Sequence, residues 1–174
     1  MYKTNFPKKR FNITLEFLKT HQPPPAKVLD LGVPNPFSDI LLKEGYTVEN
    51  TSGQDLDEDQ AQLVQSDAAI TTAFEIFEHL LSPYEVLKSI RSDYLFASIP
   101  LRLWFASAYK SKTDPWDRHY HEFEQWQFNW LLDKAGWEIL DSRRFTHLVN
   151  KIGFRPILRT FTPRYYLVYC KRKS

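Results

Sequence analysis

The stretch KVLDLG at residues 27–32 decides the fold that this sequence predicts. A short apolar run that ends in Asp and Gly is typical of a strand buried inside a parallel sheet. A helix is expected next, because Asn35 is a good N-cap, Pro36 suits the first helical position and Gly45 is well placed to end it. The segment therefore predicts a strand, a turn and a helix.

Outward from this unit, strands and helices alternate along the chain. We expect further strands at residues 46–50, 68–74, 94–99, 137–145 and 164–171. Helices are expected at residues 13–18, 83–91 and 123–131, with one helical turn within 51–67 and an irregular aromatic segment at 101–121. Such alternation predicts an α/β fold, a Rossmann-like and mostly parallel sheet with helices on both faces. We expect one domain over residues 1–174, with a helical extension at 1–26 and the α/β core at 27–174.

The composition favours a protein of the reducing cytoplasm. Cys170 is the single cysteine, so an internal disulfide and a Cys-rich metal site are both excluded. We expect no signal peptide, and the longest apolar region, 94–109, is too short to span a bilayer. The net charge is +2, and the basic clusters at 8–10 and 171–173 are interpreted as solvated ends. Neither a membrane nor a nucleic acid is therefore expected as a partner.

Four segments, in order, resemble motifs of the class I S-adenosylmethionine-dependent methyltransferases, of the type 11 kind. VLDLG at 28–32 resembles their first motif, an apolar strand that runs into acidic-x-Gly-x-Gly. AITTAFEIFEHL at 69–80 resembles their fourth-strand segment, and HEF at 121–123 with AGWEI at 135–139 resembles a later helix and strand entry. The likeness covers residues 27–170. It implies an antiparallel last strand, S-adenosylmethionine as cofactor and methyl transfer as activity.

The resemblance assigns the first motif to the methionyl end of the cofactor. Asp30 would pair with the ammonium group, and Gly32 would let the backbone approach the ligand. The alternative is that Asp30 only caps the helix and Gly32 only turns the chain. Pro34 and Pro36 replace small residues of the family pattern and remove two backbone N–H donors. Asn35 between them could compensate with its side-chain amide.

The second landmark of the family, an acidic residue that ends the second strand and holds the ribose, is missing. Ser52 stands at the expected position, and Asp55 could substitute for the acid from the loop or be an exposed loop carboxylate. Ligands of parallel sheets bind beyond the carboxyl ends of the strands. Phe74, which ends the third visible strand, and Glu75, which follows it, are therefore further candidates for cofactor contact.

Methyl transfer is an in-line displacement, and a base is needed only where the acceptor must lose a proton. His79 and His121 are the catalytic candidates, because histidine titrates near neutral pH. A structural role of the Glu78-His79 pair in its loop is the alternative. His119 and His121 lie beside Glu122, but no third ligand is in register, so we expect no metal.

Arg102 and Trp104 are candidates for binding the acceptor. Arg102 could meet an anionic group, and Trp104 could cover the pocket and exclude water. The alternatives are a surface contact for Arg102 and an exposed apolar patch for a partner or a homodimer.

The sequence thus predicts a methyltransferase acting on an unidentified small molecule. The alternative is a catalytically inactive scaffold with the same fold, which serves as a binding domain. A nicotinamide-linked oxidoreductase is disfavoured because no G-x-G-x-x-G follows the first strand.

Overall fold

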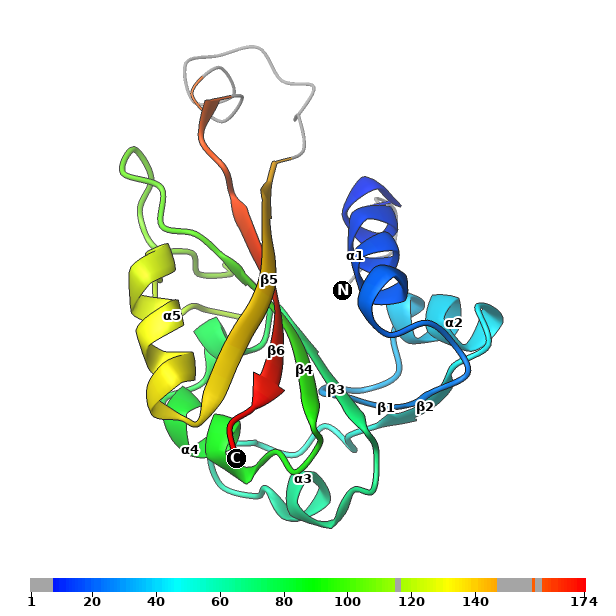
Figure 1. Cartoon of the computed structure of the whole chain (residues 1–174). Helices are drawn as coiled ribbons and strands as arrows, with labels where there is room; N and C mark the ends of the chain where they lie inside the picture. Colours follow the sequence, from blue (N-terminus) through cyan, green and yellow to red (C-terminus); the bar gives the residue numbers. More distant parts are fainter. Residues whose placement is uncertain (1–7, 115–116, 147–157, 159–160) are drawn as a thin grey trace.

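The computed structural model describes residues 8–114, 117–146, 158 and 161–174, and the strands among them form one sheet (Figure 1). The sheet has six strands in the order β2-β1-β3-β4-β6-β5. Their bounds are β1 Lys27–Asp30, β2 Thr47–Asn50, β3 Ile70–Phe74, β4 Tyr94–Pro100, β5 Trp137–Phe145 and β6 Tyr165–Arg172. Strands β1 to β4 pair in parallel, and β6 runs antiparallel between β4 and β5. The expected mixed sheet with an antiparallel last strand is confirmed.

Helices cover both faces of this sheet (Figure 1). One face carries α1 (Lys8–His21) and α2 (Pro36–Lys43). The other carries α3 (Ala61–Gln65), α4 (Pro83–Ser89) and α5 (Gln125–Lys134). A single 3-10 turn, η1 (Phe77–His79), follows β3 and was not expected from the sequence. Helix α5 begins after Phe123, which is buried ahead of the helix instead of inside it.

The side-chain alternation of the central strands divides the core into two layers. In β1, Val28 packs under α1 and α2, whereas Leu29 packs toward α4 and α5. In β6, Leu167 joins the first layer and Val168 joins the second. Because successive strand residues point to opposite faces, a strand covered on both sides must be apolar at nearly every position. This explains why β1 and β6 could be recognised as buried runs.

Helix α1 is longer than expected, because it starts at Lys8 instead of residue 13. Phe17 and Leu18 are buried against the sheet, and the Phe17 ring meets Phe96 edge-on at 6.1 Å between centroids. The helix therefore brings its first turn to the carboxyl edge of the sheet. The interpretation of residues 8–10 as a solvated end is wrong for Arg10, whose side chain is only 14% exposed.

Within the described residues, no helix has both the length and the apolar character that crossing a bilayer requires.

Candidate functional site

A first cavity of about 220 Å³ lies at the carboxyl ends of β1 and β3, under the first turns of α1. Four of the predicted cofactor residues line it, namely Asp30, Gly32, Asn35 and Phe74. The other lining residues are Arg10, Phe11, Thr14, Leu31, Val33, Phe37, Ile76 and Ser98. Pro34 and Pro36 are not among the lining residues, so the two prolines do not fill this hollow.

The carboxylate of Asp30 is the centre of a buried hydrogen-bond network. Asp30 is only 3% exposed. Oδ2 accepts hydrogen bonds from three side chains and Oδ1 from a fourth; the donors are Asn35 Nδ2 (3.1 Å), Ser38 Oγ (3.0 Å), Asn50 Nδ2 (3.0 Å) and Thr72 Oγ1 (2.6 Å). Burial raises the pKa of this carboxyl group, and the four hydrogen bonds oppose that effect. Asp30 thus ties β1, β2, β3 and the start of α2 together.

Asn35 caps α2 and faces the cavity at the same time. Its Oδ1 accepts hydrogen bonds from the N–H groups of Phe37 (2.9 Å) and Ser38 (3.2 Å), while Nδ2 donates to Asp30. This arrangement includes the capping role proposed as the alternative, but it belongs to Asn35 and not to Asp30.

The loop that follows β1 is fastened to the end of β2. Gly32 N–H donates to Thr51 Oγ1 at 2.7 Å, and Asn50 Nδ2 donates to the Gly32 carbonyl at 3.2 Å. Gly32 has a φ of 112°, which favours glycine. Beyond it, Val33 packs so closely on Gly53 that a Cβ atom at 53 would stand 2.7 Å from the Val33 methyl group. The loops after β1 and β2 are therefore in contact.

The two residues predicted to hold the ribose do not line the first cavity. Ser52 is exposed, and its N–H and hydroxyl both donate to Gln62 Oε1, at 2.9 and 3.2 Å. Asp55 is exposed and accepts a hydrogen bond from the Asp57 N–H within a loop turn. The structure thus brings together the residues assigned to the methionyl end and leaves those assigned to the ribose outside.

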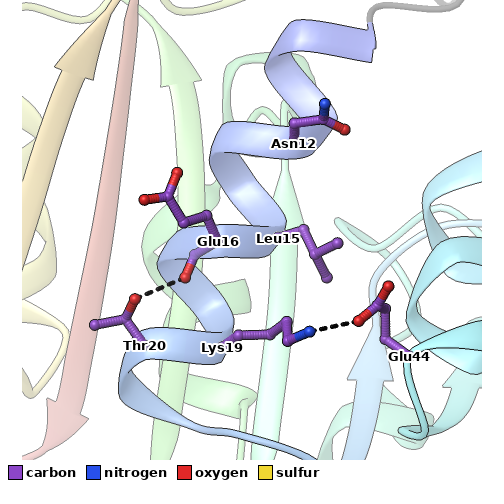
Figure 2. A pocket seen from close by; sticks show the side chains of 6 residues that line it. All are labelled: Asn12, Leu15, Glu16, Lys19, Thr20 and Glu44. Atoms are coloured by element: carbon purple, nitrogen blue, oxygen red, sulfur yellow. Dashed lines mark hydrogen bonds and ion pairs between the residues drawn. The ribbon is translucent and has the colours of Figure 1, made fainter.

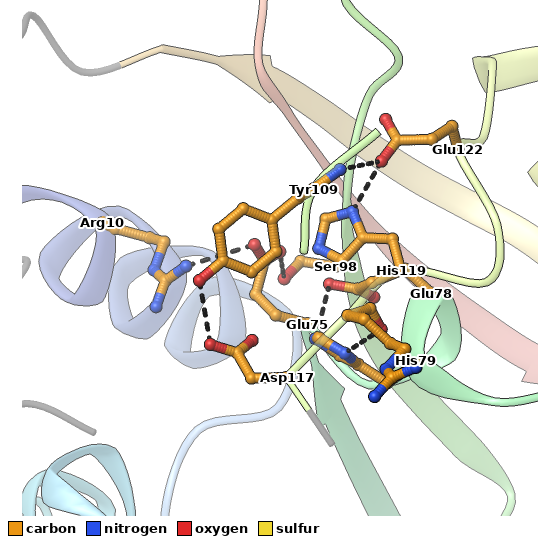
Figure 3. Close-up of polar contacts among 10 residues, drawn as sticks. Arg10, Glu75, Glu78, His79, Ser98, Tyr109, Asp117, His119 and Glu122 are labelled. Carbon is orange, nitrogen blue, oxygen red and sulfur yellow. Dashed lines mark hydrogen bonds and ion pairs between the residues drawn. The ribbon is translucent and has the colours of Figure 1, made fainter. Parts of the chain in front are cut away.

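A second cavity of about 460 Å³ adjoins the first, and Figure 3 draws several of the residues that line it. Arg10 and Phe74 line both cavities and form their common wall. The remaining lining residues are Glu75, Glu78, His79, Pro100, Tyr109, Asp114, Asp117, His119, Arg164 and Tyr165. Two predicted site residues, Glu75 and His79, therefore face this second cavity.

Glu75 holds the common wall in place. Its carboxylate accepts from Ser98 Oγ at 2.9 Å and pairs with Arg10 Nη1 at 3.2 Å (Figure 3). Its φ of 59° lies in the left-handed region, which is uncommon for residues other than glycine. Backbone strain of this kind persists where surrounding contacts enforce it, and it clusters at functional sites.

Glu78 and His79 follow on the 3-10 turn and are held by the irregular segment before α5. The Glu78 carbonyl accepts hydrogen bonds from the N–H groups of Tyr120 and His121, at 2.8 and 3.2 Å. His79 Nδ1 donates to the Arg118 carbonyl at 2.8 Å. Burial, and next the negative charge of Glu75, raise the pKa of the Glu78 carboxyl group well above its ordinary value. Burial also lowers the pKa of His79, which favours the neutral imidazole.

The other predicted catalytic and acceptor-binding residues line neither cavity. The His121 ring stacks on Phe123, with centroids 5.3 Å apart. Arg102 is on the surface, where Nη1 lies 3.5 Å from Glu124 Oε1. Trp104 is 73% exposed. These positions match the surface alternatives that the sequence left open for Arg102 and Trp104.

A third cavity of about 420 Å³ lies between α1 and the end of α2 (Figure 2). An ion pair between Lys19 Nζ and Glu44 Oε2 crosses it at 2.5 Å. None of the predicted site residues lines it.

Several cavity residues were not predicted from the sequence. Arg10 and Thr14 reach the first cavity from α1, and Ser98 reaches it from β4. Glu78 reaches the second cavity from the 3-10 turn, and so does His119 from the segment before α5, which the sequence offered only as a histidine beside Glu122. The acidic and histidine residues of EIFEH at 75–79 were a signal for the second cavity, whereas α1 gave none.

No model of a protein family matches the sequence, and no curated protein matches it. Solved structures do match, over nearly the whole chain. A Burkholderia thailandensis 1,6-didemethyltoxoflavin-N1-methyltransferase, solved with 1,6-didemethyltoxoflavin and S-adenosylhomocysteine, has a TM-score of 0.65 at 17% identity, over 94% of this chain and 78% of that one. A methyltransferase of Archaeoglobus fulgidus that depends on S-adenosylmethionine has a TM-score of 0.61 at 15% identity, over 93% and 94%.

The same fold also occurs in a protein named for another reaction. The [4+2]-cyclase SpnF has a TM-score of 0.66 at 9% identity, over 98% of this chain and 84% of that one. The similarity therefore concerns architecture, which agrees with the strand order and the antiparallel β6 described above. The chain has the fold of the class I S-adenosylmethionine-dependent methyltransferases.

Proposed function

We propose that this protein binds S-adenosylmethionine in the first cavity and transfers its methyl group to a small-molecule acceptor in the second. The observation that carries the proposal is the common wall of Arg10 and Phe74 between two cavities at the carboxyl edge of the sheet. A methyl transfer needs two ligands side by side with the reacting atoms aligned. Two adjoining cavities supply that arrangement.

The residues of the first cavity suit the methionyl end of the cofactor. A carboxylate at Asp30 and the amide of Asn35 can meet an ammonium and a carboxylate, and Gly32 permits close approach of the backbone. When bound, the cofactor supplies a methyl group on a sulfonium cation, and the carboxylates of Asp30 and Glu75 favour positive charge nearby.

The adenosyl end has less room in this conformation. The volume of about 220 Å³ is below the roughly 300–1,000 Å³ of most small-molecule sites. Cofactor binding therefore includes a shift of the first turns of α1, or a separation of the loops after β1 and β2. The Arg10–Glu75 pair is the contact that such a shift of α1 would break.

A second candidate function is a binding domain without methyl transfer. The saturated network around Asp30 favours it, because the chain itself already supplies four donors to the carboxylate. So does the serine at position 52, where the family pattern places an acidic residue.

Calorimetric titration with S-adenosylmethionine and S-adenosylhomocysteine separates the two candidates. We expect binding of one equivalent, and we expect Ile76→Trp to weaken it at least about tenfold, because the larger ring fills the first cavity. Leu42→Trp, an exposed position on α2, is the matched control and should bind normally. An absence of binding at millimolar ligand, with the protein folded, would favour the binding domain.

A gain of affinity tests where the ribose lies. Ser52→Asp restores the acidic residue that the family pattern places at the end of the second strand, and a carboxylate accepts hydrogen bonds from a diol more strongly than a hydroxyl does. If the loops after β1 and β2 separate on binding and release Ser52 from Gln62, we expect tighter binding of S-adenosylhomocysteine by about tenfold. Asp55→Ala should change the affinity little, since Asp55 is engaged in a loop turn. Equal affinities of Ser52→Asp and the wild type would place the ribose elsewhere.

A further inference from the structure

Three side chains of the second cavity place potential metal-ligand atoms near one another. One potential ligand atom from each of Glu78, His79 and His119 lies within 4.8 Å of the other two (Figure 3). Glu78 and His79 come from the 3-10 turn after β3, and His119 comes from the irregular segment before α5. The fold thus joins residues that are 40 positions apart in the sequence.

The hydrogen bonds of the two histidines fix which ring nitrogen is free. His79 Nδ1 lies 2.8 Å from the Arg118 carbonyl, which can only accept, so Nδ1 carries the proton. His119 Nδ1 lies 2.9 Å from Glu122 Oε1, and the same Oε1 accepts the Tyr109 N–H at 3.0 Å. Nδ1 of His119 is therefore also the protonated nitrogen, and Nε2 of each ring keeps a lone pair. Histidines that bind metals are oriented in this way by a carbonyl or a carboxylate.

The Glu78 carboxylate is buried beside the His79 ring. Its side chain is 1% exposed, and Oε2 has no hydrogen-bond partner among the described residues. The other oxygen, Oε1, is 3.8 Å from His79 Nε2. A buried carboxylate oxygen beside an imidazole lone pair is unfavourable unless a proton or a cation lies between them.

We propose that Glu78, His79 and His119 bind a divalent transition-metal ion through one carboxylate oxygen and two Nε2 atoms. Two imidazoles and one carboxylate form a ligand set that suits zinc and its neighbours in the first transition row. Bonds of about 2.0–2.2 Å require the three ligand atoms to move closer together than they are here. The rings and the carboxylate can do so by side-chain rotation into the open cavity, which leaves further coordination positions accessible.

The surroundings favour a cation. The acidic residues Glu75, Asp114 and Asp117 line the same cavity, and Glu122 supports His119 from behind. The basic residues of the lining are Arg10 and Arg164. Arg10 is paired with Glu75. The proposal gives His79 the role of a ligand, where the sequence predicted a general base and no metal. It rests on the geometry of these side chains and is independent of methyl transfer.

Calorimetry on the full chain, after treatment with a chelator and without cofactor, tests the site. We expect one equivalent of Zn²⁺ to bind, with Mg²⁺ and Ca²⁺ binding far more weakly because imidazole is a poor ligand for them. Glu78→Gln and His119→Ala should each weaken Zn²⁺ binding at least about tenfold. His121→Ala is the matched control, a histidine two positions away that lines neither cavity, and it should retain wild-type affinity.

Glu78→Gln preserves the shape of the side chain, so its result stands even where His119→Ala does not fold. A second measurement uses the wild type alone. Added Zn²⁺ should shift the ring signals of His79 and His119 and leave those of His21, at the end of α1, unshifted. The proposal is overturned if the wild type binds no Zn²⁺, if Glu78→Gln binds it as tightly as the wild type, or if the ring signals of His21 shift as much as those of His79 and His119.

Discussion

Asp30→Ala is expected to lower the free energy of unfolding by about 3–5 kcal/mol at neutral pH. The change removes the acceptor of four hydrogen bonds, from Asn35, Ser38, Asn50 and Thr72, at a site that is 3% exposed. Urea denaturation followed by tryptophan fluorescence measures the loss. Asp39→Ala, on the exposed side of α2, is the control and should change stability by no more than about 1 kcal/mol. Equal losses in the two variants would contradict the structural role of Asp30.

The raised pKa of Asp30 gives this effect a pH dependence. Above the ordinary Asp pKa of about 3.9, the unfolded chain has released its proton while the folded protein still holds it. The contribution of Asp30 to the free energy of unfolding therefore falls as the pH rises from about 3.9 through the pKa of the folded protein. Over this pH range, the free energy of unfolding of the wild type should fall relative to that of Asp30→Asn. A difference that grows with pH would mean that the four hydrogen bonds outweigh burial.

Asp30 also shows why a loss-of-binding variant must be chosen with care. Asp30→Ala would abolish ligand binding through unfolding as readily as through a lost contact. Ile76→Trp changes the same cavity from a partly exposed position and leaves the network intact.

The strands could be predicted from sequence because each of them is specified locally. Val28 and Leu29 face opposite layers of the core, so an unbroken apolar run was the correct signal for a buried strand. Asn35 and Pro36 marked the start of α2 by local capping chemistry. The first turn of α1 was missed because Lys8, Lys9 and Arg10 resemble a solvated tail, and of the three only Arg10 packs against the rest of the protein.

The site was predictable only where it lies on one continuous segment. Asp30, Gly32 and Asn35 meet at the first cavity because a strand, its turn and the next helix must follow one another. Ser52 was placed by counting along the chain, and the contacts of its loop with Gln62 hold it outside the cavity. The pairing of Glu78 and His79 with His119 depends on where an irregular segment crosses the sheet edge, and no local pattern specifies that crossing.

Glu78→Gln is expected to have opposite effects on stability with and without metal. In chelator-treated protein at slightly alkaline pH, the variant should be more stable than the wild type by about 1–3 kcal/mol. It replaces a buried carboxylate, one oxygen of which has no partner among the described residues, by a neutral amide. The amide N–H can donate to the lone pair of His79 Nε2, which lies 3.8 Å from the wild-type Oε1.

With zinc present the order should reverse. Free Zn²⁺ at a hundred times its Kd adds about 2.7 kcal/mol to the wild type by mass action, and adds little to a variant that binds it weakly. Urea denaturation of the wild type and of Glu78→Gln, each with chelator and with zinc, gives the four free energies of unfolding to compare. Glu85→Gln, on the exposed face of α4, is the control and should behave as the wild type in both conditions. A stabilising effect of Glu78→Gln in both conditions would show that the carboxylate is buried for a reason other than metal binding. A destabilising effect in both conditions would show that the protein itself supplies the partner of Glu78. Only a bound cation makes the sign of the change in stability depend on whether chelator or zinc is present.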